Sequence, residues 1–208
     1  IVCENDTYLA RAVIIATGAH HRKLGAKGEE ILTGAGVSYC ATCDGAFFKG
    51  KTTAVIGGGD VAIEDAIFLA RMCSKVYLIH RRDELRGAKS LQNRLMSLDN
   101  VEVIWDTVVE EIVGSDKVEA LKLNNKKTGE KSELKVDGVF VAVGIEPDSG
   151  QYAGQVETDN QGYIIAGEDG RTSVDGVFAA GDVRTKALRQ IITAAADGAN
   201  CITSAQSY

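Results

Sequence analysis

Two cysteines with two residues between them, Cys40 and Cys43, are the side chains of this sequence best suited to redox chemistry. At this spacing two thiols can close a small disulfide ring, so the pair can take up and release two electrons as it alternates between dithiol and disulfide. Asp44 follows directly, and a carboxylic acid beside a thiol can pass a proton to or from a leaving thiolate. We therefore predict a redox-active disulfide at Cys40 and Cys43, with Asp44 as its acid.

A zinc site is the main alternative use of the cysteine pair. It would need a second pair of cysteines or histidines at ligand spacing, and the rest of the sequence offers only the adjacent His20 and His21. We therefore expect no metal site. The other cysteines, Cys3, Cys73 and Cys201, lie in apolar contexts, so we expect them to be buried and inert.

A glycine-rich turn downstream of the cysteines predicts a dinucleotide site. Residues 57–62 match the pattern G-x-G-x-x-A between a predicted strand and a predicted helix. In this pattern the first glycine allows a tight turn, the next lets backbone approach a pyrophosphate at the helix N-terminus, and the alanine lets the helix pack closely. A glycine turn that serves packing alone is the alternative. The residues expected in the site are Gly57, Gly58, Gly59, Asp60, Val61 and Ala62.

The end of the following strand indicates which nicotinamide cofactor binds. A site for NAD usually has an acidic residue about 20 positions beyond the glycines, where it holds the ribose 2′-hydroxyl group. Residues 80–86 instead contain three arginines, and Arg81 and Arg86 together can favour the 2′-phosphate of NADPH roughly a hundredfold. An exposed ion-pair cluster with Asp83 and Glu84 is the alternative. The cofactor-binding residues expected here are His80, Arg81, Arg82 and Arg86.

Apolar spacing places these motifs in an α/β unit. The elements expected are strands at 53–57, 76–79, 101–105 and 138–143 and helices at 60–73 and 87–98. Alternating apolar residues between 112 and 123, closed by a turn at 124–129, predict an antiparallel edge. The predicted fold is α/β, with a Rossmann-like NADPH-binding domain whose parallel sheet has an antiparallel edge.

Two segments are expected to cross between domains. Residues 20–28 are polar and rich in turn formers, and the only proline, Pro147, follows the apolar strand that ends the α/β unit. Outside these crossings the sequence predicts strands at 12–17 and 176–180, a hairpin at 155–167 and an alanine-rich helix at 187–204.

Composition limits the classes of partner. The chain has 208 residues, of which 45% are apolar, and a net charge of −6, which disfavours nucleic acid as a partner. No apolar run approaches the length of about 20 residues that a membrane span needs. Five cysteines with only one close pair fit a reducing compartment. We therefore expect a cytoplasmic protein that binds neither nucleic acid nor membrane.

Four segments together resemble the low-molecular-weight, bacterial-type thioredoxin reductases. They are CATCDG at 40–45, GGGDVAIEDA at 57–66, HRRDELR at 80–86 and AAGDVRTKALRQIITAAADG at 179–198. The first and third are specific within the pyridine nucleotide-disulfide oxidoreductases, whereas the glycine turn is common to all of them. The resemblance extends over nearly the whole chain, and the segments follow the family's order.

The resemblance implies a flavoprotein that uses NADPH to reduce thioredoxin. Members hold FAD in one domain and NADPH in a second domain inserted within it, and they are homodimers. On this basis Cys43 faces the flavin, Cys40 attacks the disulfide of thioredoxin and Asp44 is the acid. The three arginines would contact the 2′-phosphate. In the last segment Gly181 and Asp182 would bind FAD, the latter on its ribityl or phosphate side, and Arg189, Gln190 and Ile191 would line the isoalloxazine.

The family begins with an FAD-binding strand and glycine turn, but only 39 residues precede Cys40. We therefore expect a fragment that lacks the N-terminal FAD-binding segment. Residues 1–22 and 149–208 are assigned to a partial FAD domain, and residues 23–148 to the NADPH-binding domain with the redox-active disulfide. The reductase activity, bound FAD and the homodimer are then expected of the intact parent protein.

Two other functions compete with this interpretation. An NADH-dependent flavoprotein reductase that supplies a peroxiredoxin shares the layout, although the arginines of residues 80–86 favour NADPH. A nonenzymatic module that binds NADPH and toggles its cysteines to regulate a partner is the other.

Overall fold

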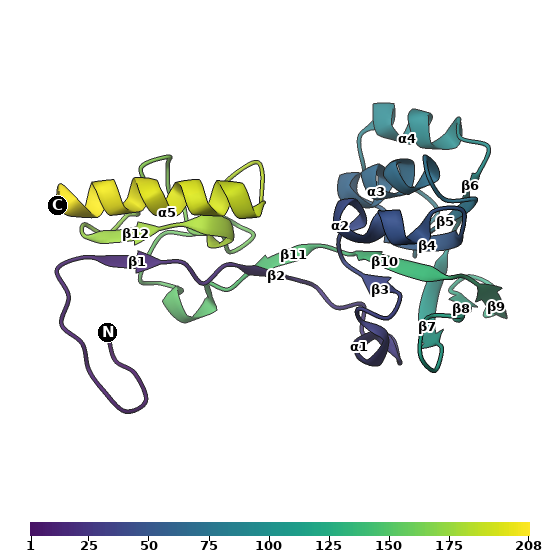
Figure 1. Ribbon diagram of the computed structural model, residues 1–208, viewed down its shortest axis with the longest axis horizontal. Helices are drawn as coiled ribbons and strands as arrows, with labels where there is room; N and C mark the ends of the chain where they lie inside the picture. Colours follow the sequence, from purple (N-terminus) through teal and green to yellow (C-terminus); the bar gives the residue numbers. More distant parts are fainter. The chain divides into compact units, whose positions relative to one another are not determined.

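The computed structural model describes residues 1–208, and the chain divides into two compact units. Unit 1 consists of residues 1–20 and 145–208, and unit 2 of residues 21–144. Unit 2 is therefore a continuous segment inserted between the two parts of unit 1, as the colours of Figure 1 show. The chain passes from one unit to the other through β2 (Ala19–His21) and β11 (Ile145–Pro147), which pair with each other.

A five-stranded parallel sheet forms the centre of unit 2. Its strands, in spatial order, are β3 (Val37–Ser38), β10 (Gly138–Ala142), β4 (Thr52–Gly57), β5 (Lys75–Ile79) and β6 (Val101–Ile104). The central strand β4 is buried from Thr53 to Ile56. Such a continuous apolar run is expected when both faces of a parallel sheet are covered.

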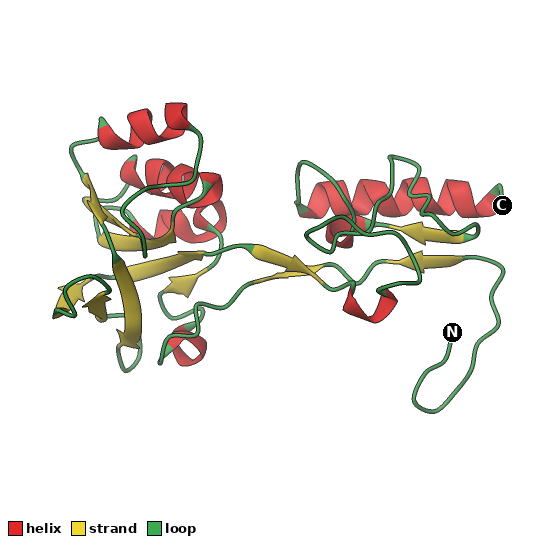
Figure 2. Ribbon diagram, turned by 180° about the vertical axis from the view of Figure 1, so that it is seen from behind, coloured by secondary structure: helices red, strands yellow, loops and turns green.

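Most helices cover one face of the parallel sheet, whereas a smaller sheet and the short helix that contains Leu32 pack on the other (Figures 1 and 2). The helices of unit 2 are α1 (Glu29–Leu32), α2 (Ala41–Asp44), the 3-10 helix η1 (Gly45–Phe48), α3 (Asp60–Ala70) and α4 (Lys89–Met96). Val55 of β4 packs in one core cluster with Ile63 of α3. Its neighbours Ala54 and Ile56 pack in a second cluster with Leu121, because successive side chains of a strand point to opposite faces.

The antiparallel strands form a sheet of their own. They are β7 (Thr107–Val113), β8 (Ala120–Asn125) and β9 (Lys131–Lys135), whereas the parallel sheet ends at β3 and β6. The α/β fold class is confirmed, but the prediction of an antiparallel edge on the parallel sheet is wrong. Asp106, between β6 and β7, has a φ of 53°, a left-handed conformation that redirects the chain.

Unit 1 is built on two short parallel strands and one long helix. They are β1 (Val13–Ile15), β12 (Val177–Ala179) and α5 (Ile191–Gln206), with the 3-10 helices η2 (Gly150–Tyr152) and η3 (Gly181–Val183). The core around Ile164 and Val183 is small. The hairpin predicted at 155–167 is reduced to one antiparallel bridge between Thr158 and Ile164. The last helix begins at Ile191 rather than 187. No helix of the chain is long and apolar enough to cross a membrane.

Candidate redox and nucleotide-binding sites

Cys40 and Cys43 form a disulfide at the start of α2, in unit 2. Their Cα atoms are 5.3 Å apart. The backbone N–H of Cys43 donates to Cys40 Sγ at 3.2 Å, and Thr42 Oγ1 lies 3.4 Å from the same sulfur. Cys40 is half-buried, whereas Cys43 is exposed. Two donors directed at one sulfur favour a negative charge there once the disulfide is reduced.

A serine that the sequence did not single out holds the proposed acid. Ser38, at the end of β3, donates from Oγ to Asp44 Oδ2 at 2.6 Å and accepts from the backbone N–H of Cys40 at 3.1 Å. Ser38 is buried, with 7% of its surface exposed. Water therefore competes little for its hydroxyl group. One buried side chain thus fixes both the carboxylate and the backbone of the first cysteine.

Glu29 fixes the residue before the disulfide. Its buried carboxylate accepts hydrogen bonds from the Tyr39 hydroxyl group and from the backbone N–H groups of Leu24 and Gly25, each at 2.8 Å. Burial, together with this carboxylate, raises the pKa of Tyr39 to about 12. Tyr39 therefore remains a neutral donor, and the segment that leads to Cys40 is anchored on its N-terminal side.

The other three cysteines have no part in this site. Cys73 and Cys201 are buried, as expected, and burial raises the pKa of both thiols. Cys3 is exposed, so the expectation that it is buried is wrong. It lies in the first residues of unit 1, where the apolar side chains of Val2 and Leu9 are also exposed, at 82% and 99%.

The glycine turn lies between β4 and α3. A Cβ atom at Gly57 would come within 2.4 Å of the carbonyl oxygen of Ala142, and one at Gly58 within 2.2 Å of the His80 ring. Gly59 directly precedes α3, and a Cβ atom at this position would have no atom within 4 Å. A side chain at either of the first two glycines would therefore clash with the protein beneath the turn. The space beside Gly59 is open, so a ligand can approach the backbone there. Val61 is exposed and Ala62 is fully buried.

His80 supports the glycine turn from below. The residue is 4% exposed, and burial lowers the pKa of its ring. Its Nε2 atom is buried without a hydrogen-bond partner, and the ring lies directly against Gly58, so His80 supports the backbone of the glycine turn. The carboxylate of Asp60 is also engaged in a hydrogen bond within the protein, because its Oδ1 accepts from the N–H of Ala88 at 2.7 Å.

Residues 80–86, which we call the arginine loop, leave three guanidinium groups free. Arg81, Arg82 and Arg86 are exposed, and none of them forms an ion pair. Asp83 pairs with Lys127 instead, at 2.8 Å, so the alternative of an arginine cluster neutralised by Asp83 and Glu84 is not formed. The backbone N–H of Arg86 donates to Gly58 O at 2.8 Å, which ties the loop to the glycine turn.

Two polar atoms of unit 1 are buried without a partner. They are Asp182 Oδ1, in η3, and Arg189 Nε, just before α5. The Arg189 guanidinium also lies 3.9 Å above the Tyr163 ring. Gln190 and Ile191 are both exposed at the start of α5. A buried polar atom without a hydrogen bond is costly, so Asp182 and Arg189 fit the polar groups of a bound ligand such as FAD.

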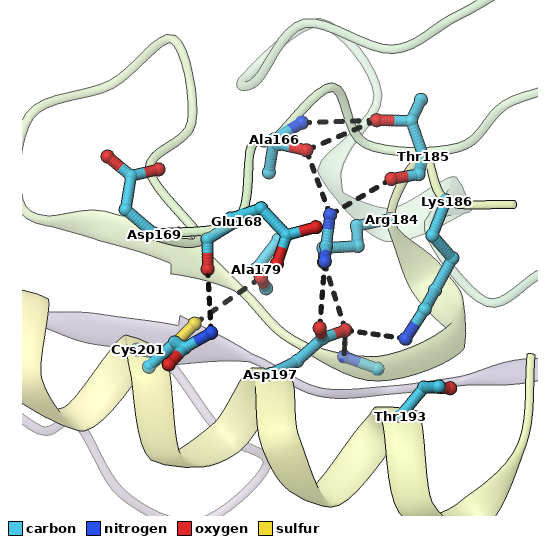
Figure 3. A network of polar contacts seen from close by, with 12 residues as sticks. Ala166, Glu168, Asp169, Ala179, Arg184, Thr185, Lys186, Thr193, Asp197 and Cys201 are labelled. Atoms are coloured by element: carbon cyan, nitrogen blue, oxygen red, sulfur yellow. Dashed lines mark hydrogen bonds and ion pairs between the residues drawn. The ribbon is translucent and has the colours of Figure 1, made fainter. Parts of the chain in front are cut away.

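A buried ionic network holds the segment around Asp182 (Figure 3). Asp197, on α5, accepts from Arg184 Nε and Nη2 at 2.9 and 2.7 Å, from Lys186 Nζ at 2.7 Å and from the N–H of Gly181 at 2.9 Å. Burial raises the pKa of Asp197, but the hydrogen bonds from Arg184, Lys186 and Gly181 outweigh it, and the pKa is about 2. The helix is thereby fixed to both ends of the Gly181–Val183 turn.

The family model for pyridine nucleotide-disulphide oxidoreductases matches residues 2–198. Curated thioredoxin reductases from Listeria innocua and Treponema pallidum are 50% and 48% identical to the sequence, and both alignments include 100% of the chain. The chain belongs to the thioredoxin reductases of this family. It spans 66% of the length of the Listeria innocua protein and 67% of the Treponema pallidum protein.

Solved thioredoxin reductases share this fold. The structure from Streptococcus pyogenes has a TM-score of 0.90 at 48% identity, with 100% of this chain and 69% of that chain covered. The structure from Lactococcus lactis has a TM-score of 0.75 at 43% identity, with 99% and 68% covered.

The predicted site residues fall into two groups. Unit 2 contains the disulfide with Asp44, the glycine turn and the arginine loop, and unit 1 contains Gly181, Asp182, Arg189, Gln190 and Ile191. The sequence did not reveal Ser38, Glu29, Lys127 or Asp197. Lys127 and Asp197 act on side chains distant in sequence, whereas Ser38 and Glu29 act on near neighbours but belong to none of the motifs. No group of three or more His, Cys, Asp and Glu side chains is placed to hold a metal ion.

We expect Asp197→Asn to destabilise unit 1 by about 3 kcal/mol at pH 7, because it leaves Arg184 and Lys186 buried without their counter-charge. The pKa of Asp197 lies below the ordinary value of about 3.9, so its stabilising effect is present above about pH 4 and is lost as the pH falls toward about 2. Hydrogen exchange of the α5 peptide, measured from pH 7 to pH 2, tests both expectations.

Asp175→Asn is the matched control, because Asp175 is an exposed carboxylate of unit 1 that forms no ion pair. Exchange from α5 as slow in Asp197→Asn as in this control would show that the buried network does not hold the helix.

Proposed function

We propose that this chain carries the NADPH-binding and dithiol parts of an enzyme that reduces the disulfide of thioredoxin. The observation that supports this most strongly is the Cys40–Cys43 disulfide with Asp44 held beside it. The same unit contains the glycine turn and the arginine loop, whose guanidinium groups form no ion pair. Because the chain spans about two thirds of its curated relatives, the activity is proposed for the whole protein.

The overall reaction takes two electrons and one proton from NADPH and one proton from solvent. NADPH becomes NADP⁺, and the disulfide of thioredoxin becomes two thiols. FAD, when bound, supplies the two-electron relay between nicotinamide and disulfide. Asp182 and Arg189 would hold it, since each has a buried polar atom that lacks a partner, and Gly181, Gln190 and Ile191 would complete that site.

The dithiol then passes its electrons to thioredoxin by disulfide exchange. The Cys40 thiolate attacks one sulfur of the thioredoxin disulfide, which forms a mixed disulfide and releases a thiolate that takes up a proton. Cys43 next attacks the Cys40 sulfur, which restores the Cys40–Cys43 bond and releases the second thiol. The donors at Cys40 Sγ favour Cys40 as the first attacking thiolate, and Asp44 supplies the proton to the leaving sulfur.

The arginine loop supports NADPH rather than NADH as the reductant. Three exposed guanidinium groups without ion pairs form a strong site for the 2′-phosphate. This speaks against the NADH-dependent reductase that supplies a peroxiredoxin. Arg81, Arg82 and Arg86 would contact the phosphate, while Gly58 and Gly59 would let backbone approach the pyrophosphate.

Thioredoxin is accordingly the proposed partner, and the whole protein is proposed to be a homodimer in the cytoplasm. The free thiol of Cys3, which is exposed, fits a reducing compartment. A net charge of −6 supports a protein rather than a nucleic acid as the partner.

Asp44→Asn should slow the transfer of electrons from the reduced chain to oxidised thioredoxin about a hundredfold, because the leaving thiolate loses its proton donor. The chain is first reduced, freed of reductant and mixed with oxidised thioredoxin, and free thiols are alkylated and counted over time. Ser38→Ala should give an intermediate rate, since the acid remains but its buried hydrogen bond is lost. The affinity for NADP⁺ should not change in either variant.

Asp116→Asn is the control, because Asp116 is exposed and forms no ion pair. An Asp44→Asn chain that reacts as fast as this control would remove Asp44 from the proposed mechanism.

Replacing Arg81 and Arg86 by alanine should weaken NADP⁺ binding roughly a hundredfold and change NAD⁺ binding less than about twofold, since only NADP⁺ carries the 2′-phosphate. Calorimetry with both nucleotides measures the two affinities. The double variant Arg71→Ala/Arg94→Ala removes the same charge from two exposed arginines of unit 2 outside the loop. An equal loss in both double variants would mean that the loop attracts the cofactor only through net charge.

A further inference from the structure

A lysine of the antiparallel sheet reaches the arginine loop. Lys127 lies in the turn between β8 and β9, and its Nζ atom is 2.8 Å from Asp83 Oδ2 and 3.2 Å from Asp106 Oδ2. Asp83 belongs to the arginine loop, and Asp106 precedes β7. One ammonium group therefore bridges two carboxylates beside the proposed 2′-phosphate site.

The turn holds Lys127 in a defined position. Asn125 Oδ1 accepts from the backbone N–H groups of Lys127 and Thr128 at 2.9 and 3.0 Å. The N–H of Lys126 donates to Asp106 O at 2.6 Å, and the N–H of Asp106 donates to Arg82 O at 3.1 Å. A continuous chain of hydrogen bonds thus links the turn to the arginine loop, so the ion pair joins two segments that are already close.

The charge of Asp83 is unfavourable where it lies. It stands between Arg82 and Arg86 in the sequence, and an acidic residue in this part of a dinucleotide site is the feature that selects NAD and repels a 2′-phosphate. Lys127 hydrogen-bonds Asp83 and lowers the pKa of that carboxyl group. Glu84 of the same loop is exposed and forms no ion pair, so without Lys127 the loop would present a second uncompensated negative charge to the cofactor.

We propose that Lys127 is a positioning residue for cofactor choice, which neutralises the Asp83 carboxylate so that the arginine loop accepts the 2′-phosphate of NADPH. This rests on the proposed function of the arginine loop. The lysine acts through Asp83 and does not itself contact the phosphate.

The test compares Lys127→Gln with Lys126→Gln by calorimetry of the whole chain with NADP⁺ and with NAD⁺ at low ionic strength. Lys126 is the matched control, since it lies in the same turn, is exposed and forms no ion pair. The ratio of the two affinities should fall roughly twofold to fivefold in Lys127→Gln relative to Lys126→Gln, as is usual for an exposed ion pair. The affinity for NAD⁺ should be the same in both variants.

The variant Asp83→Asn distinguishes neutralisation of the Asp83 carboxylate from other roles of Lys127. Asp83→Asn alone should keep the wild-type preference for NADP⁺. The double variant Asp83→Asn/Lys127→Gln should recover most of the preference for NADP⁺ that Lys127→Gln loses. If the pair served only to order the loop, Asp83→Asn would lose the preference as well. If Lys127 held the phosphate itself, the double variant would not recover. Either result overturns the proposal, as does an equal effect of Lys126→Gln.

The nucleotide affinities of the wild-type chain distinguish a failure of this inference from a failure of the proposed function. Equal affinity of the wild type for NADP⁺ and NAD⁺ would reject the role of the arginine loop. A wild type that prefers NADP⁺, with a Lys127→Gln variant that prefers it equally, would reject only the role of Lys127.

Discussion

The parallel pairing of β3, β10, β4 and β5 is the constraint on which the proposed chemistry of unit 2 depends. Parallel strands end at the same edge of their sheet, and three of these strands continue into functional segments there. β3 leads through Ser38 to the disulfide, β4 leads to the glycine turn and β5 leads to the arginine loop. Since both faces of the sheet are covered by apolar clusters, the strands cannot slide without exposing their side chains.

Each of these segments is then fixed by a buried or hydrogen-bonded polar group. Ser38 holds Asp44, Glu29 holds Tyr39 before the first cysteine, and the His80 ring fills the space beneath Gly58. In unit 1 Asp197 has the same function for the turn that contains Asp182. By contrast, the three arginines proposed to bind the cofactor are exposed without ion pairs, and Asp182 and Arg189 each have a buried polar atom without a partner, as is expected of groups reserved for a ligand.

Local sequence patterns were sufficient for most elements of unit 2. The strand predicted at 53–57 is β4 (Thr52–Gly57), and the helix predicted at 60–73 is α3 (Asp60–Ala70), because apolar spacing and glycine punctuation agree there. The antiparallel strands were predicted, but their separation from the parallel sheet was not, since apolar alternation does not show which strands pair across a turn. Lys127 and Asp197 could not be found because their partners are distant in sequence, and Ser38 because its contact with Asp44 depends on the turn between β3 and α2 rather than on a motif.

The most direct test of the central claim uses a chain in which Cys43 is replaced by serine. Mixed with oxidised thioredoxin and quenched with an alkylating reagent that blocks the thiol released on thioredoxin, this variant should retain a mixed disulfide through Cys40, because Cys43 is absent and cannot resolve it. Mass spectrometry of the cleaved complex would locate the bond. The Cys40→Ser variant should form none at Cys43. A mixed disulfide that forms only through Cys43, or none in either variant, would contradict the proposed mechanism.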